Sequence, residues 1–169
     1  MCADRLHLLC VPARQCTAAY TWPVQSVGRR LAASDAAHRH APVGVPGAIA
    51  AKRVHRSRNV VAVTGDAGFL MNFQEIETAL RLELARVFLV WNDSEYGIIK
   101  WHQLRHFGRE SNIRFNNPDL AAYAESFGAR GYRVESTEQL LPSLQRAFED
   151  NTAVLIDCPV DYRENMKLT

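Results

Sequence analysis

Two short apolar runs with a helical pattern between them constrain the fold of this chain most strongly. Residues 60–63 (VVAV) and 86–91 (RVFLVW) are nearly continuous apolar stretches rich in β-branched side chains. Such runs are typical of parallel strands that are covered on both faces. Between the runs, apolar side chains recur at helical spacing, at Ile76, Ala79, Leu80 and Leu84. The stretch therefore predicts a βαβ unit within an open α/β sheet.

Each apolar run ends in a polar turn that carries an aspartate. The first run leads into Thr64-Gly65-Asp66-Ala67-Gly68 and the second into Asn92-Asp93-Ser94-Glu95-Tyr96-Gly97. Because open α/β sheets bind ligands at the carboxyl ends of their parallel strands, we expect both turns at one ligand-binding edge. Small residues let a phosphate approach the backbone, and the free N–H groups of a following helix favour an anion.

Two carboxylates beside a space of phosphate size indicate a magnesium ion. This cation takes one or two protein carboxylates and completes its shell with water and phosphate oxygens. Asp, Asn and Gly are also ordinary turn and cap residues at strand ends, so the residue types alone leave a purely structural reading open.

The remaining pattern predicts further helices and strands around this unit. Asn72 is expected to cap the central helix, with Glu75 as its capping-box partner. Other helices are expected at residues 46–54, 120–127 and from a Thr137 cap to residue 148, with short strands at 132–134 and 153–157. We expect a three-layer α/β sandwich with a mainly parallel sheet.

Composition excludes several functions. The 169-residue chain is 47% hydrophobic, which suits one globular domain, and its longest apolar run is too short to span a bilayer. Net charge is +2, but residues 1–41 carry five Arg and two Asp, and no basic stripe occurs beyond them. Nucleic acid is therefore not an expected partner. Four irregularly spaced cysteines and no secretory signal predict reduced thiols and a cytoplasmic location.

The spacing of the two acidic turns resembles a known cofactor signature. Gly65-Asp66-Ala67 and Asn92-Asp93, with 26 residues between Asp66 and Asp93, are similar to the GDG…NN motif of thiamine diphosphate enzymes. Flanking segments resemble the carboxy-terminal cofactor-binding domain of acetolactate synthases, particularly the catabolic type: GDAGFLMNFQEIETALRL, WNDSEYGIIKWHQ, HFGRESN, YAESFGARGYRVES and IDCPVDYRENMKL. The resemblance covers residues 44–169 and implies the thiamine diphosphate-binding fold.

The resemblance also implies a role for particular residues. Asp66 and Asp93 would give side-chain oxygens to Mg²⁺, and Glu95 its backbone carbonyl. Position 93 is commonly Asn in this superfamily, and Asp is still an oxygen ligand. The residues implied in cofactor binding are Gly65, Asp66, Ala67, Gly68, Asp93, Glu95, Tyr96, Gly97 and Ile98.

The reaction implied is the condensation of two pyruvate molecules into 2-acetolactate with loss of carbon dioxide, as in acetoin or branched-chain amino acid formation. In this superfamily the glutamate that activates the cofactor lies in a pyrimidine-binding domain of a partner subunit in a homo-oligomer. No residue of this chain is assigned to that glutamate, so no catalytic base is named. The chain is expected to be a carboxy-terminal fragment that is inactive alone.

Residues 1–43 do not match the family pattern, and we expect a disordered or aberrant segment, such as the product of a wrong reading frame. Its Cys2, Cys10 and Cys16 with His38 and His40 lack the CxxC pair of a zinc site. Three other functions remain open for residues 44–169: another thiamine diphosphate-dependent 2-keto acid decarboxylase, a non-catalytic remnant domain, and a phosphoacceptor receiver domain, which would need an earlier acidic pair.

Overall fold

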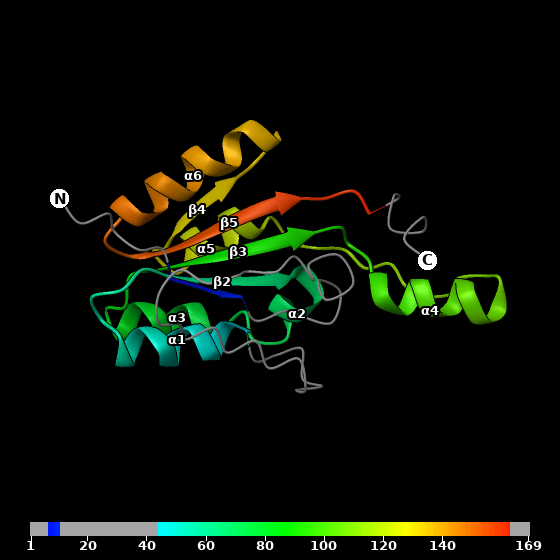
Figure 1. The fold of residues 1–169 in the computed structure, drawn as a ribbon, viewed down its shortest axis with the longest axis horizontal. Helices are drawn as coiled ribbons and strands as arrows, with labels where there is room; N and C mark the ends of the chain where they lie inside the picture. The colour runs from blue at the N-terminus through cyan, green and yellow to red at the C-terminus, as the bar shows by residue number, and fades with distance from the viewer. Residues whose placement is uncertain (1–6, 11–43, 163–169) are drawn as a thin grey trace.

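The structure is a computed structural model that describes residues 7–10 and 44–162. Its centre is a five-stranded parallel sheet in the order β1-β2-β3-β5-β4. The strands are β1 (His7–Cys10), β2 (Val60–Gly65), β3 (Arg86–Asn92), β4 (Arg130–Arg133) and β5 (Ala153–Pro159). The predicted α/β class and parallel sheet are thus confirmed, as Figure 1 shows.

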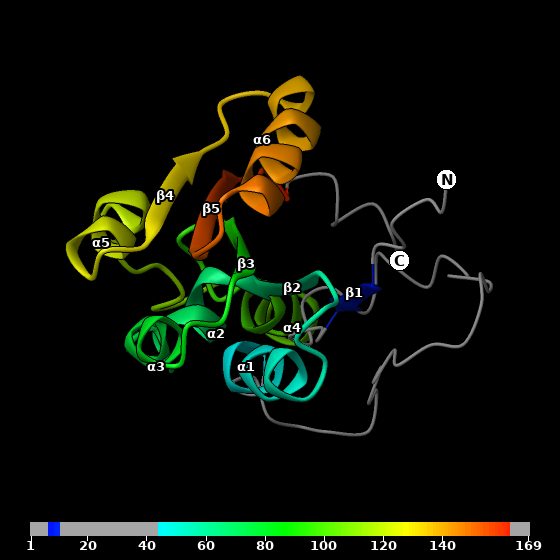
Figure 2. The ribbon, with the colours of Figure 1, turned by 90° about the vertical axis from the view of Figure 1, so that its left-hand side faces the viewer.

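Helices cover both faces of the sheet. The helices are α1 (Gly44–Val54), α2 (Asp66–Leu70), α3 (Glu75–Arg81), α4 (Gly97–Phe107), α5 (Leu120–Ser126) and α6 (Thr137–Glu149). Helices α1, α3 and α5 pack on one face and α6 on the other, which gives the expected three layers (Figures 1 and 2). Helix α4 projects beyond the carboxyl ends of the strands, and none of its residues is buried.

The runs are apolar throughout because successive side chains of a strand point to opposite faces of the sheet, and both faces are covered by helices. Val60 and Ala62 belong to the core on the α1 side, whereas Val61 and Val63 belong to the core on the α6 side. Every residue of β2 is buried, as expected of a central parallel strand.

A tight approach of α5 to β4 depends on a glycine. A Cβ atom at Gly131 would overlap the carbonyl group of Ala121 in α5.

Helix α4 ends at a glycine. Gly108 adopts φ +66°, and its N–H group donates to the carbonyl oxygen of Leu104 at 3.0 Å.

Three local predictions were wrong. The expected turn over Gly65–Gly68 is partly helical, because α2 begins at Asp66 directly after β2. Helix α3 begins at Glu75 with Gln74 at its N-cap, so Asn72 does not open it. Helix α6 has Ser136, not Thr137, at its N-cap.

The N-terminal segment contains one unexpected element. His7–Cys10 forms β1, which pairs in parallel with β2 from Val60 to Val63, although no strand pattern was recognised there. Residues 1–6 and 11–43 lie outside the described part of the chain, so the expectation that residues 1–43 are disordered or aberrant stays untested. Within the described ranges, no helix is both long and apolar enough to cross a membrane.

Candidate functional site

The register of β2 and β3 brings the two acidic turns to one edge of the sheet. Gly65 at the end of β2 pairs with Trp91 near the end of β3, so the next residues, Asp66 and Asn92, lie at the same edge of the sheet. Asp66 is fully buried. Its Oδ2 accepts a hydrogen bond from the Ser94 backbone N–H at 2.8 Å, and its Oδ1 accepts from the Ala67 N–H at 2.7 Å. The predicted neighbourhood of the two turns is therefore present.

Asp93 has a carboxyl group whose charge is disfavoured. Burial, followed by the negative charge of Asp66, raises the pKa of Asp93 to about 6. Its Oδ1 accepts a weak hydrogen bond from the Glu95 N–H at 3.3 Å, which acts in the opposite direction. Two neighbouring carboxyl groups that repel each other form a donor set that a hard divalent cation would stabilise.

These carboxylates fit a magnesium ion bound partly by the protein. Among the described residues, no group of three or more His, Cys, Asp or Glu side chains is arranged to hold a metal. A site with two carboxylates leaves coordination positions for water, backbone carbonyl and phosphate oxygens, which is how Mg²⁺ is usually held beside a phosphorylated ligand.

The loop that carries Glu95 is fastened to a distant segment. Glu95 forms an isolated antiparallel bridge with Arg114, flanked by hydrogen bonds from the Tyr96 N–H to Ile113 at 2.8 Å and from the Phe115 N–H to Ser94 at 3.1 Å. The Glu95 carboxylate accepts from Lys100 Nζ at 2.6 Å and from Arg114 Nε at 3.0 Å. These contacts hold the side chain of Glu95 toward the two basic groups.

The other predicted site residues lie at the start of α2 or of α4. Ala67 and Gly68 are in α2, and the small Gly65 precedes them. Tyr96 is the N-cap of α4, and its ring lies 4.8 Å from that of Phe115. Gly97 and Ile98 are the first two residues of α4, so all nine predicted residues lie at the ends of β2 and β3.

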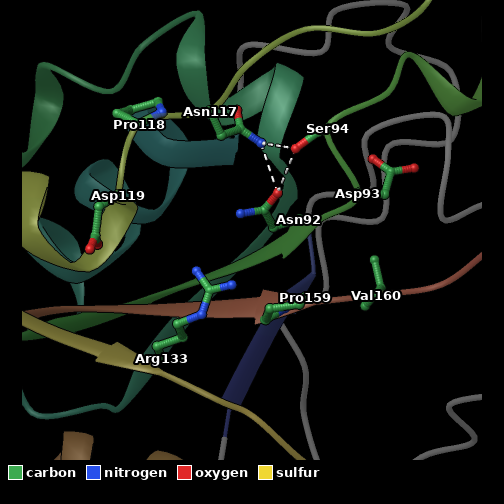
Figure 3. Close-up of a pocket in the computed structure, with 9 residues that line it drawn as sticks. All are labelled: Asn92, Asp93, Ser94, Asn117, Pro118, Asp119, Arg133, Pro159 and Val160. Atoms are coloured by element: carbon green, nitrogen blue, oxygen red, sulfur yellow. Dashed lines mark hydrogen bonds between the residues drawn. The ribbon is translucent and has the colours of Figure 1, made fainter.

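An amide from a third segment joins this arrangement. Asn117 Nδ2 donates to Asp66 Oδ2 at 2.6 Å and to Asn92 Oδ1 at 2.7 Å, and it lies 3.2 Å from Ser94 Oγ. Figure 3 shows the Asn117 amide directed at Asn92 and Ser94, while the Asp93 carboxylate points away from them. Asn117 is not among the site residues predicted from the sequence.

A polar cavity of about 430 Å³ opens beside this amide. It is lined by Asn92, Asp93, Ser94, Asn117, Pro118, Asp119, Arg133, Pro159 and Val160 (Figure 3). Two of these lining residues bind the buried Asp157, which accepts from Asn92 Nδ2 and from Arg133 Nη1, both at 2.9 Å. Burial raises the pKa of Asp157, although both of these donors lower it.

Asn117, Asp157 and Arg133 were missed because no local pattern marks them. Asn117 lies 51 positions from Asp66 and Asp157 lies 65 positions from Asn92, so only the fold brings each pair together. One available signal was the position of Asp157 at the end of an apolar run, as for the two predicted aspartates.

Comparison with known proteins supports the expected cofactor class. Residues 15–158 match the family model "Thiamine pyrophosphate enzyme, C-terminal TPP binding domain", where thiamine pyrophosphate is another name for thiamine diphosphate. The cofactor predicted from the sequence is thus the one for which this domain family is named. This match begins at residue 15, whereas the resemblance seen in the sequence begins at residue 44.

Curated relatives include acetolactate synthases. The chain is 46% identical to the acetolactate synthase of Bacillus subtilis (strain 168) over 126 residues, which are 75% of this chain and 22% of the relative. It is 40% identical to the catabolic acetolactate synthase of Raoultella terrigena over 123 residues, or 73% of this chain and 22% of the relative. The chain thus spans about a fifth of the length of these relatives.

Solved structures show the same fold. The benzoylformate decarboxylase of Polynucleobacter necessarius superposes with a TM-score of 0.62 at 25% identity, over 71% of this chain and 23% of that one. A thiamine diphosphate-dependent 4-hydroxybenzoylformate decarboxylase of Rhodococcus jostii RHA1 gives a TM-score of 0.67 at 21% identity, over 72% and 23%. Fold, acidic turns and sequence similarity agree, and the chain therefore belongs to the thiamine pyrophosphate enzyme family and contains its C-terminal TPP-binding domain.

Proposed function

We propose that this chain binds thiamine diphosphate through a magnesium ion as the cofactor-holding domain of an acetolactate synthase. The observation that carries the proposal is the closeness of Asp66 and Asp93, which directly follow two adjacent parallel strands, in a chain 46% identical to an acetolactate synthase. The reaction would be the conversion of two pyruvate molecules into 2-acetolactate and carbon dioxide.

In this proposal the acidic turns hold the charged end of the cofactor. Asp66 and Asp93 give carboxylate oxygens to Mg²⁺, and Glu95 gives its backbone carbonyl. Asp66 Oδ1 suits this role, because the hydrogen bond that it accepts from the Ala67 N–H uses one lone pair. The second lone pair of the oxygen can bind the metal. Ala67 and Gly68 have side chains small enough for a diphosphate to lie against the backbone.

The bound cofactor supplies the electron sink that decarboxylation of a 2-keto acid requires. The protein residues bind and orient it at the carboxyl edge of the sheet, where Tyr96, Gly97 and Ile98 begin the exposed α4 helix. The pyrimidine half would be held by a pyrimidine-binding domain of the same or another subunit, in a homo-oligomer. A cytoplasmic location is part of the same proposal.

A second candidate is a thiamine diphosphate-dependent decarboxylase of another 2-keto acid. The structural similarity to a benzoylformate decarboxylase, with a TM-score of 0.62 and 25% identity, favours it. The higher identity to acetolactate synthases over 75% of the chain places it second. A non-catalytic remnant of the same domain would share the cofactor site, so turnover separates it from both enzymes.

Equilibrium dialysis with thiamine diphosphate tests the binding step. We expect retention of the cofactor in the presence of Mg²⁺ and release when the metal is removed with EDTA. Thiamine without phosphates is the control ligand and should not be retained, because the proposed contacts are to the metal and the diphosphate. Equal retention with Mg²⁺ and with EDTA would contradict the proposal.

A further inference from the structure

The amide nitrogen of Asn117 lies among oxygen atoms from both acidic turns. It is 2.6 Å from Asp66 Oδ2, 2.7 Å from Asn92 Oδ1 and 3.2 Å from Ser94 Oγ. An amide group carries two hydrogens, so the two closest acceptors, Asp66 and Asn92, use both of them. The proposed function assigns no role to Asn117.

The orientation of the Asn117 amide follows from its surroundings. If the amide were turned over, its carbonyl oxygen would face the oxygens of Asp66 and Asn92, and both hydrogen bonds would be lost. In the observed orientation Asn117 Oδ1 is buried and has no hydrogen-bond partner among the described residues. The residue therefore leaves one acceptor unpaired while it donates to the carboxylate.

These contacts fix one oxygen of the Asp66 carboxylate. Asp66 Oδ2 accepts from Asn117 Nδ2 and from the Ser94 N–H, which come from two different segments. A carboxylate held at Oδ2 from two directions cannot rotate freely, so the position of Oδ1 is fixed as well. Oδ1 is the atom that accepts from Ala67 and is proposed to face the metal.

Asn117 is itself held from both sides along the chain. Before it, residues 113–115 are fastened to the Ser94–Tyr96 loop by the bridge between Arg114 and Glu95. After it, Pro118 restricts the backbone, and Asp119 caps α5 by accepting from the Ala122 N–H at 2.9 Å. The amide is thus presented by a braced segment.

We propose that Asn117 is a positioning residue that orients Asp66 and links it to the Asn92–Ser94 turn, so that the magnesium site is formed before the cofactor arrives. The inference rests on the proposed function for the identity of the ligand. Its geometric part, that Asn117 immobilises the Asp66 carboxylate, stands on the hydrogen bonds alone.

Calorimetric titration of Mg²⁺ with thiamine diphosphate tests the consequence for binding. Asn117→Ala should weaken binding by about 10- to 100-fold, the usual loss when a residue that orients a metal ligand is removed. Asn116→Ala removes the same side chain from the adjacent exposed position and should bind like the parent. If Asn117→Ala shows no cooperative thermal unfolding, Asn117→Gln replaces it in the titration. Asn117→Gln keeps an amide but displaces it, so it should also bind more weakly than the parent.

Amide hydrogen exchange without ligand provides a separate readout. The Ser94 N–H donates to Asp66, so Asn117→Ala should speed exchange at Ser94 while the core amide of Phe88 keeps its rate. A merely structural role would accelerate both. Unchanged exchange at Ser94, or unchanged affinity in a folded Asn117 variant, would overturn the inference. Failure of the parent chain to bind the cofactor would instead count against the proposed function and leave the exchange result to decide the geometry.

Discussion

Arg86 places a positive charge in the core without completing its hydrogen bonds. The residue is 3% exposed, and its two terminal nitrogens have no hydrogen-bond partner among the described residues. Its Nε donates to the Leu84 carbonyl at 3.2 Å, and burial lowers the pKa of Arg86 to about 10. Burial, followed by repulsion from the Arg86 cation, lowers the pKa of Lys52.

Replacing Arg86 with methionine should therefore stabilise the chain. Arg86→Met removes two unpaired buried donors and keeps a long apolar side chain beside Phe88. We expect the free energy of unfolding in urea to rise by about 1–3 kcal/mol. Arg81→Met, which removes an exposed arginine paired with Glu77, is the matched control and should change stability little. A clear loss of stability in Arg86→Met would mean that the guanidinium gains more from the Phe88 ring, which lies 5.8 Å from Arg86 Cζ, or from a hydrogen-bond partner than its burial costs.

Cys158 links stability to pH in the alkaline range. The side chain is 3% exposed, and burial, aided by the charge of Asp157, raises the pKa of Cys158 to about 12 from an ordinary value of 9.0. The folded chain keeps the thiol proton where the unfolded chain loses it. Between pH 9 and 12 the thiol should therefore make unfolding more favourable as pH rises.

Urea unfolding at several pH values measures this contribution. Lysines and tyrosines titrate in the same range, so the informative quantity is the difference between the parent and Cys158→Ala. The stability advantage of the parent should shrink steadily above pH 9. A constant difference from pH 7 to 11 would show that the thiol titrates normally in the folded chain.

At the scale of elements, the start of α5 combines a helix cap with the site. Asp119 accepts a hydrogen bond from the Ala122 N–H and lies two residues after Asn117. Asp119→Ala should lower the free energy of unfolding by about 1 kcal/mol, the usual value of such a cap. Ser136→Ala is the control, because Ser136 is the N-cap of α6 and makes no capping hydrogen bond. Equal losses in the two variants would contradict the assignment of Asp119 as the effective cap.

The central elements were predictable because their signals are local. The strands β2, β3 and β5 follow from continuous apolar runs, and α1 and α5 correspond to the helices expected at residues 46–54 and 120–127. Asp66 and Asp93 were found because each ends such a run. The short α2 was not predicted, because five residues that include a glycine carry too little periodicity to separate a helix from a turn.

Other features depend on contacts between distant residues. Asn117, which contacts Asp66, lies between two such contacts, the Glu95–Arg114 bridge before it and the packing of α5 beside β4 after it. The pairing of Arg133 with Asp157 likewise needs β4 and β5 to be neighbours in the sheet. No single-sequence pattern encodes either arrangement, so these site residues had to come from the structure.

We expect that this chain alone makes no acetolactate. No residue of the chain is assigned to cofactor activation, and general acid–base assistance is typically worth about 10²- to 10⁴-fold in rate. Supplied with pyruvate, Mg²⁺ and thiamine diphosphate, the chain should stay at background in a colour assay for acetoin after acidification. Adding a separately produced pyrimidine-binding domain should raise turnover. Robust activity of the chain alone would require an activating carboxylate among its own residues.

We propose that Asp66 and Asp93 together hold the metal and diphosphate of the cofactor, and calorimetric titration of thiamine diphosphate at saturating Mg²⁺ measures this contribution. Asp66→Ala and Asp93→Ala each remove a proposed metal ligand, so each should weaken binding by about tenfold or more. Glu77→Ala removes an exposed carboxylate on α3 and should leave binding unchanged. Parent-like affinity in either aspartate variant, with the fold intact, would show that this aspartate does not hold the metal.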